Sequence, residues 1–199
     1  SISVTAPVLG ELFSAGQSVT VSERVERSIF AAGETVLISS GAGHNAYVGG
    51  RVVTLDGEFG HDVFVAGGTV VIEQGAHIKG SLHAAGESVT IHGTIDGDVR
   101  TAGARVSSDA TVGGTFTAEA DELTFSGGRI GQDLRTSSDT TVVNDASVTV
   151  AGEKERFTTP VQTAVSTQHA FSPLGTIGAL VMYLLLGAVV MLALPKKLA

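Results

Sequence analysis

Residues Asp62–Val106 read DVFVAGGTVVIEQGAHIKGSLHAAGESVTIHGTIDGDVRTAGARV, and their pattern indicates the architecture of the chain. Within this stretch, Val, Ile and Leu alternate with small and polar residues in short runs such as Ser88–His92. This alternation is typical of β-strands and not of helices. Glycines recur at equivalent places in successive runs, at Gly67, Gly86 and Gly103. A pattern that repeats at such an interval predicts a solenoid, in which each repeat forms one turn.

The repeat extends over most of the chain. The glycine position, called here the anchor, is occupied in successive repeats by Gly16, Gly33, Gly50, Gly67, Gly86, Gly103, Ala120 and Ser138. Most steps between anchors are 17 residues, with one step of 19 and one of 18. We expect glycine there because it tolerates positive φ at a corner between strands.

Apolar residues stand at fixed offsets from each anchor. In the repeat of Gly67 they are Val63, Val70, Ile72 and Ile78, and the other repeats have comparable residues at these offsets. Stacked turns place identical positions in ladders about 4.8 Å apart. The pattern therefore predicts an all-β fold, a triangular parallel β-helix of about eight 17-residue turns with three short inward-facing strands per turn. Asp, Asn or Ser five residues before an anchor, such as Asp62 and Asp98, is expected to cap local backbone amides.

The composition excludes several functions. The 199 residues include no cysteine, so disulfides and thiolate chemistry are ruled out. The net charge is −8, and residues 1–151 hold 18 acidic against 8 basic side chains. Such a domain repels a phosphate backbone, so no nucleic-acid binding is expected.

The C-terminal part has a different character. Residues 174–194 read LGTIGALVMYLLLGAVVMLAL, which contains no charge and would span about 31 Å as a helix, enough to cross a bilayer. We predict a β-helix domain at 1–151, a flexible linker at 152–173, a transmembrane α-helix at 174–195 and the start of a cytoplasmic tail at 196–199. The expected lipid-facing residues are Leu174, Ile177, Leu180, Leu184, Leu186, Val190 and Leu194. Lys196 and Lys197 follow the span directly, so the positive-inside rule places the β-helix outside the cytoplasm.

An aromatic column stands three residues before the first four anchors, at Phe13, Phe30, Tyr47 and Phe64, and His83 and Arg100 continue it. This offset should face water. One interpretation is that a local segment such as Ser1–Val8 folds over the rings. The other, which we favour, is a contact surface for another copy or a partner.

Metal and catalytic sites are not indicated. His44 and His61 share one position in adjacent turns, but Arg27 and Gly80 at the neighbouring positions supply no third ligand. The basic residues of the coil are scattered rather than clustered with carboxylates on one face. We therefore predict neither an enzyme nor a cofactor.

The run Asp62–Val106 resembles the bactofilins, a family of polymer-forming cytoskeletal proteins, and the similarity covers roughly residues 10–150. The resemblance implies a right-handed β-helix that assembles without nucleotide, through its terminal turns, into membrane-associated scaffolds of bacteria. Typical bactofilins have only a short membrane-targeting segment, whereas this chain has a full apolar span.

These observations predict a non-enzymatic, membrane-anchored scaffold of the cell envelope that self-associates. The charged run 153–156 should block the C-terminal end of the coil, so the N-terminal turns are the expected contact. The expected self-association residues are Phe13, Val19, Phe30, Tyr47 and Phe64. The partners are then the chain itself and the lipid bilayer, with envelope proteins or glycans as further candidates. The alternative function is an extracytoplasmic adhesin or glycan-binding stalk.

Overall fold

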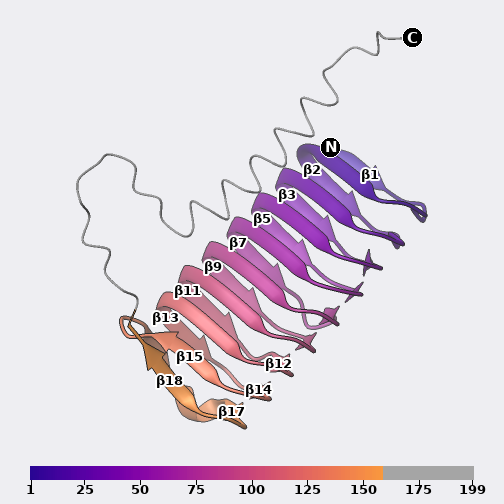
Figure 1. The fold of residues 1–199 in the computed structure, drawn as a ribbon. Helices are drawn as coiled ribbons and strands as arrows, with labels where there is room; N and C mark the ends of the chain where they lie inside the picture. Colours follow the sequence, from indigo (N-terminus) through magenta and orange to yellow (C-terminus); the bar gives the residue numbers. More distant parts are fainter. Residues whose placement is uncertain (159–199) are drawn as a thin grey trace, which may run out of the picture. The chain divides into compact units, whose positions relative to one another are not determined.

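The computed structural model describes residues 1–158, which form a parallel β-solenoid of about nine turns. Figure 1 shows the turns stacked side by side along one axis. Seven long strands dominate the stack: β2 (Leu12–Val21), β3 (Ile29–Ile38), β5 (Ala46–Leu55), β7 (Val63–Ile72), β9 (Leu82–Ile91), β11 (Val99–Ser108) and β13 (Phe116–Phe125). They belong to an 11-stranded parallel sheet that begins with β1 (Ile2–Val4) and ends with β15 (Leu134–Ser137) and β18 (Lys154–Phe157), while β16 (Thr141–Val143) pairs with β13.

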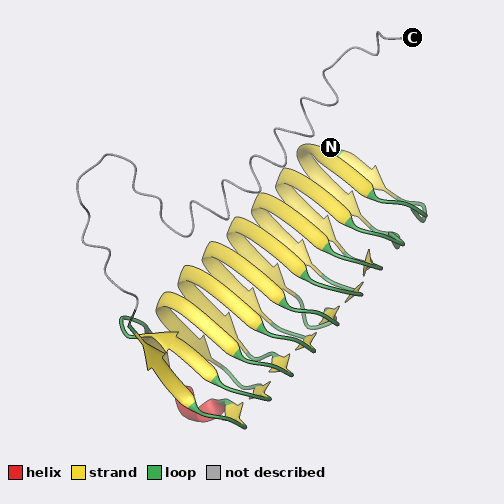
Figure 2. Cartoon of the chain, viewed as in Figure 1, coloured by secondary structure: helices red, strands yellow, loops and turns green. Residues whose placement is uncertain are grey.

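A second, narrow sheet closes each turn. Its seven strands have two residues each: β4 (Gly41–Ala42), β6 (Glu58–Phe59), β8 (His77–Ile78), β10 (Thr94–Ile95), β12 (Thr111–Val112), β14 (Arg129–Ile130) and β17 (Thr149–Val150). One short 3-10 helix, Asp145–Ser147, precedes β17, and the part of the chain that is described contains no α-helix (Figure 2).

Each long strand bends just after its anchor. The pairing of β2 with β3 runs from Leu12↔Ile29 to Gly16↔Gly33 and resumes at Ser18↔Thr35, so Gln17 is left out of the ladder. One long strand therefore supplies two of the three inward-facing segments expected for a turn, and the two-residue strand supplies the third.

The predicted core columns are confirmed. Val70, Ile72 and Ile78 are completely buried, as is Val63 four residues before the anchor. The equivalent residues of other turns belong to the same continuous cluster, including Phe59, Phe116 and Phe125. Burial of each large aliphatic side chain contributes roughly 1.5–3 kcal/mol before the entropy of ordering is subtracted.

The strand register is unchanged at the one step of the central repeats that is longer than 17 residues. Gly67 pairs with Gly86 and Ile72 with Ile91, although these anchors are 19 residues apart. The additional length lies in the turn after Ile72, where the amide of Ala76 donates to the carbonyl of Glu73 over 3.0 Å. The ladder is therefore set by the columns and not by the number of residues per turn.

The anchor glycines have another cause than the one expected. None of them has positive φ, a conformation found instead at glycines such as Gly41, Gly57 and Gly93. A Cβ added at Gly103 would lie 2.3 Å from the carbonyl oxygen of Gly86 in the preceding turn. The same contact with the preceding anchor would arise at Gly33, Gly50, Gly67 and Gly86, so from Gly33 to Gly103 glycine is required because successive backbones approach too closely for a side chain, whereas Ala120 carries a Cβ in the next turn.

The column of Asn, Asp and Ser also acts differently from the expectation. These side chains accept a hydrogen bond from the backbone amide one turn further on, rather than from a local amide. Asp62 Oδ1 accepts from Ser81 N over 2.8 Å, and Asp98 Oδ1 accepts from Thr115 N over 3.0 Å. Asn45, Ser81 and Asp133 make the same contact to Asp62, Asp98 and Glu153.

The last turns depart from the expected numbering. Leu123 pairs with Val142, so Val142 and not Thr141 continues the apolar column there. The coil also runs past Ala151, its expected end, because β18 pairs with β15 inside the segment expected to be a linker. The expected transmembrane helix at 174–195 and the tail at 196–199 lie outside the described residues. Up to residue 158, no helix has the length and apolar character needed to cross a membrane.

Candidate self-association surface

The aromatic column forms a continuous stack of rings on the outside of the large sheet. The centroid distances are 4.6 Å for Phe13–Phe30, 4.9 Å for Phe30–Tyr47 and 5.1 Å for Tyr47–Phe64, with ring planes within 7° of parallel. His83 adds a fifth ring, 4.6 Å from Phe64. The parallel register aligns the residues one above another, so the spacing of the strands fixes the spacing of the rings.

Each inner ring of the stack has another ring on both of its faces, whereas Phe13, at the N-terminal end, has a ring on one face only. Phe30, Tyr47 and Phe64 are half-buried, whereas Phe13 is 59% exposed. The strand pairing explains this difference, because Ile2–Val4 stacks on Val19–Val21 and not on Phe13. The interpretation that Ser1–Val8 folds over the rings is therefore wrong.

Val19 does not belong to the open surface. Its side chain is completely buried, and Ile2 of β1 pairs directly with it. The open part of the first long strand is its other half, Leu12–Gly16, which pairs only with β3 among the strands of the described region. There Leu12 is only partly buried, and the hydroxyl of Ser14 is buried without a hydrogen-bond partner.

A column of small residues runs beside the rings and was not recognised from the sequence. It lies one residue before each anchor and comprises Ala15, Ala32, Gly49, Ala66, Ala85 and Ala102. We call these two columns together the aromatic face. The signal was present in the sequence, since the same offset from the anchor is Ala or Gly in six successive repeats.

The face changes character toward the C-terminus. In the ring column, Arg100 pairs in register with His83 and Thr117, and Arg135 and Glu155 follow. Burial, and secondarily the charge of Arg100, lowers the pKa of His83. The polar end of the face is hollowed into a shallow open depression over Thr117, lined by Arg100, Arg135 and Glu119 among others.

The C-terminal end of the coil carries charges at core positions. Lys154 pairs in register with Leu134 and Arg156 with Thr136, although Leu134 and Thr136 belong to inward columns. Lys154 Nζ is 2.7 Å from Asp145 Oδ1, an ion pair that joins β18 to the 3-10 helix at this end. A second coil stacked on β18 would bury these cations, so this end is blocked in the way that sheet edges commonly are.

The described histidines are not gathered into a metal centre. The rings of His44 and His61 lie 5.4 Å apart at an interplanar angle of 79°, adjacent as their spacing predicts. Across residues 1–158 no three His, Asp or Glu side chains are grouped so as to hold a metal ion.

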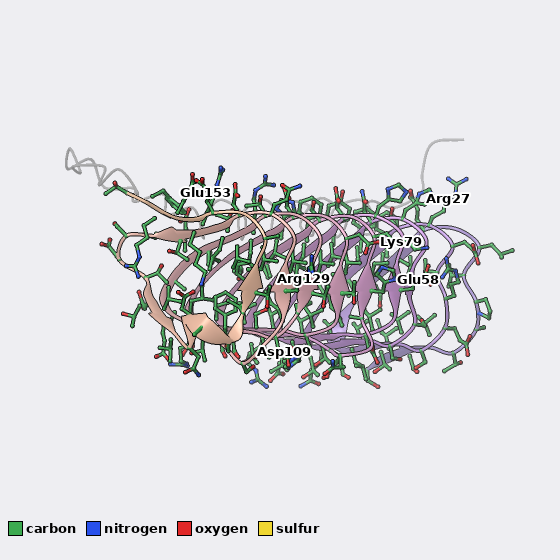
Figure 3. All side chains as sticks on the ribbon, turned by 90° about the horizontal axis from the view of Figure 1, so that it is seen from below. Arg27, Glu58, Lys79, Asp109, Arg129 and Glu153 are labelled. Carbon is green, nitrogen blue, oxygen red and sulfur yellow. The ribbon has the colours of Figure 1, made fainter. Side chains whose placement is uncertain are left out.

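His77, His92 and Glu58 form pairs that the sequence did not reveal. His92 Nδ1 lies 2.6 Å from Asp109 Oδ1, and His77 Nε2 lies 3.0 Å from both carboxylate oxygens of Asp96. Glu58 and Lys79 lie beside each other (Figure 3), and the hydrogen bond from Lys79 lowers the pKa of the Glu58 carboxyl. Each of these pairs joins neighbouring turns, which is why the local sequence does not show it.

Comparison of the chain with protein-family models, with curated proteins and with solved structures finds no match. Its function is therefore inferred from the chemistry of its own surface. The two ends and the aromatic face of the coil are the features that this chemistry distinguishes.

Proposed function

We propose that this chain is a non-enzymatic, membrane-anchored scaffold of the bactofilin type, whose right-handed β-helix self-assembles. The proposal rests on the difference between the two ends of the coil: one exposes unpaired strand edge and apolar side chains, and the other exposes charged side chains. The Leu12–Gly16 half of β2 presents strand edge, a partly exposed core residue and the open face of Phe13. The other end presents Lys154 and Arg156 at core positions.

The two ends favour assembly through the N-terminal turns. Unpaired strand edges and exposed apolar side chains are stabilised by a further strand, and a second molecule can supply it. Stacking of another ring on Phe13 would continue an existing series of parallel rings. Such aromatic pairs contribute about 0.5–1.5 kcal/mol beyond the area that they bury.

The proposal includes a location. The apolar stretch 174–194 is the proposed anchor in a bacterial membrane, and Lys196 and Lys197 place the coil on the extracytoplasmic side. An adhesin or glycan-binding stalk at that location is the second candidate. It is supported only by the exposed ring of Phe13, since sugars bind to ring faces and the inner rings already stack on one another.

Substitution of Phe13 tests the proposal. The full chain in detergent should form end-to-end dimers joined through the N-terminal turns, because the other end is blocked, and negative-stain microscopy should show them as particles longer than one coil. Phe13→Arg should shorten them to single coils, because the stack would then end in a cation. Glu11→Arg, an exposed charge change next to the same strand, serves as the control. A wild-type protein that is monomeric at high concentration contradicts the proposal, and monomers that bind glycans would favour the adhesin.

A further inference from the structure

The aromatic face has a shape that is complementary to itself. Large side chains form a ridge in one column, and Ala and Gly form a shelf in the neighbouring column of the same strands. In the turn of β3 the pair is Phe30 and Ala32, and in the turn of β7 it is Phe64 and Ala66. A ridge of this kind fills a shelf of the same length on another surface.

The charges on this face are complementary in the same way. Glu119 occupies the small-residue column in β13, and its carboxylate has no ion-pair or hydrogen-bond partner within residues 1–158. Arg100 and Arg135 occupy the ring column one turn before and one turn after it. Between these two arginines lies Thr117, over which the surface is hollowed. Arg100 also contacts Asp98, at 3.6 Å, and Arg135 contacts Glu155, at 3.1 Å, within the same coil. An acidic side chain from outside would add to these exposed ion pairs, with an arginine on each side of it.

We propose that the aromatic face binds the aromatic face of a second copy, with the two coils parallel and related by a two-fold axis along the coil direction. This symmetry places the ring column of each copy over the small-residue column of the other, turn for turn. Phe30 then packs on Ala32 of the second copy, and Glu119 enters the depression between Arg100 and Arg135 of the second copy.

The antiparallel arrangement fits less well. A two-fold axis across the coils places ring column on ring column, so ridge meets ridge and the shelves face an empty gap. It also moves the arginines opposite aromatic residues and leaves Glu119 opposite neutral ones. Only the parallel arrangement satisfies both shape and charge.

The size of the face predicts a weak dimer. Nine turns about 4.8 Å apart make a strip roughly 40 Å long. With a width of roughly 13 Å, each copy buries about 500–600 Å², which is less than the ~800 Å² per partner of a standard stable interface. Pairing of this strength is favoured when copies are concentrated on one surface. It does not require the end-to-end contact proposed above.

Charge reversal on this face is the first test, with sedimentation of the full chain as the measurement. Glu119→Arg should weaken the dimer at least about tenfold, because it replaces the carboxylate that enters between Arg100 and Arg135 by a cation. The matched control is Asp121→Arg, an exposed acid of the same strand that lies at the bend and outside the two columns of the face. Mixing Glu119→Arg protein with Arg100→Glu/Arg135→Glu protein should restore pairing between unlike chains. Dimerisation of Glu119→Arg equal to that of the wild type, or a monomeric wild type, overturns the inference.

Cross-linking provides a second test that does not depend on the charge variants. The chain has no cysteine, so Phe30→Cys and Ala32→Cys each introduce a unique thiol. Facing sheets pack about 10 Å apart, within reach of a short bis-maleimide. In the parallel arrangement both positions face the same turn of the second copy, so the mixture should cross-link, and so should each variant alone, because residues two apart on a strand are only about 7 Å apart. The antiparallel arrangement places Phe30 opposite a turn toward the other end of the coil, so the absence of cross-links in all three samples contradicts the parallel arrangement, and particle length in the microscope reports separately on end-to-end assembly.

Discussion

Val89 and Thr90 are neighbours in β9 whose side chains lie on opposite sides of the sheet. Val89 is 1% exposed, in the core, whereas Thr90 faces outward. Val89→Asp places an unpaired carboxylate in an apolar column and should reduce the free energy of unfolding by about 3–5 kcal/mol. Thr90→Asp should change it by less than about 1 kcal/mol. Thermal unfolding followed by circular dichroism distinguishes them, and equal melting temperatures would contradict the register.

Gly103 tests the close approach of successive turns at the anchors. A methyl group at this position meets the carbonyl oxygen of Gly86 at 2.3 Å, so one backbone must move. Gly103→Ala should therefore reduce the free energy of unfolding by about 1–3 kcal/mol, as overpacking commonly does. Gly10→Ala is the control, since nothing lies within 4 Å of the added Cβ. Chemical denaturation measures both, and a neutral Gly103→Ala would show that backbone contact does not select glycine.

The sequence predicted the apolar columns correctly because strand alternation and a fixed repeat leave little freedom in which residues face the core. It did not predict the contacts between turns that select glycine at the anchors and Asn, Asp or Ser five residues before them. The clash behind Gly103 and the hydrogen bond from Thr115 to Asp98 both join residues one turn apart. Local turn rules describe a single chain segment and so assign these residues to local roles.

At the scale of the elements, the ring stack should make stability depend on pH. Burial, and then the charge of Arg100, lowers the pKa of His83 in the folded protein, against partial opposition from Asp62 and Asp98. Below about pH 6.5 the unfolded chain binds a proton that the folded chain resists, so the stack loses stability as the pH falls. His83→Phe should remove this part of the loss.

The measurement is the difference in unfolding free energy between wild type and His83→Phe at pH 7.5 and pH 5. At pH 5 the unfolding free energy of the variant should rise relative to that of the wild type, because protonation of the His83 imidazole destabilises only the wild type. Another histidine such as His44, exposed and outside the stack, serves as a control when changed to Phe. A pH-independent difference would show that His83 is not the group concerned.

The positions of the terminal elements were the hardest part to predict. β1 covers Val19 rather than the rings, and β18 adds charged residues to a column that is apolar elsewhere. Both depend on which half of a neighbouring turn is unpaired, and hydrophobic periodicity carries no information about that. For a similar reason the sequence placed Thr141 in the apolar column that Val142 occupies. The step in this repeat has 18 residues, and the sequence does not show at which corner of the turn the additional residue lies.

At the scale of the whole molecule, the proposed topology makes a direct prediction. Protease added to intact cells with permeable outer layers should degrade the coil, because the proposed topology, based on Lys196 and Lys197 in the sequence, puts the coil outside the cytoplasm. Immunoblotting against the coil provides the readout, with a cytoplasmic protein as the control for lysis. A coil that is fully protected would lie in the cytoplasm.

The turn after Ile72 shows where this architecture accepts additional sequence. Gln74 and Gly75 are exposed, and the two strands that flank them keep their pairing partners on both sides. A solenoid that absorbs two residues at this corner without shifting a single column should accept a longer loop there too. We therefore expect that a fluorescent protein or an epitope grafted between Gln74 and Gly75 leaves the coil intact, which makes this corner a natural place to label the molecule in living cells.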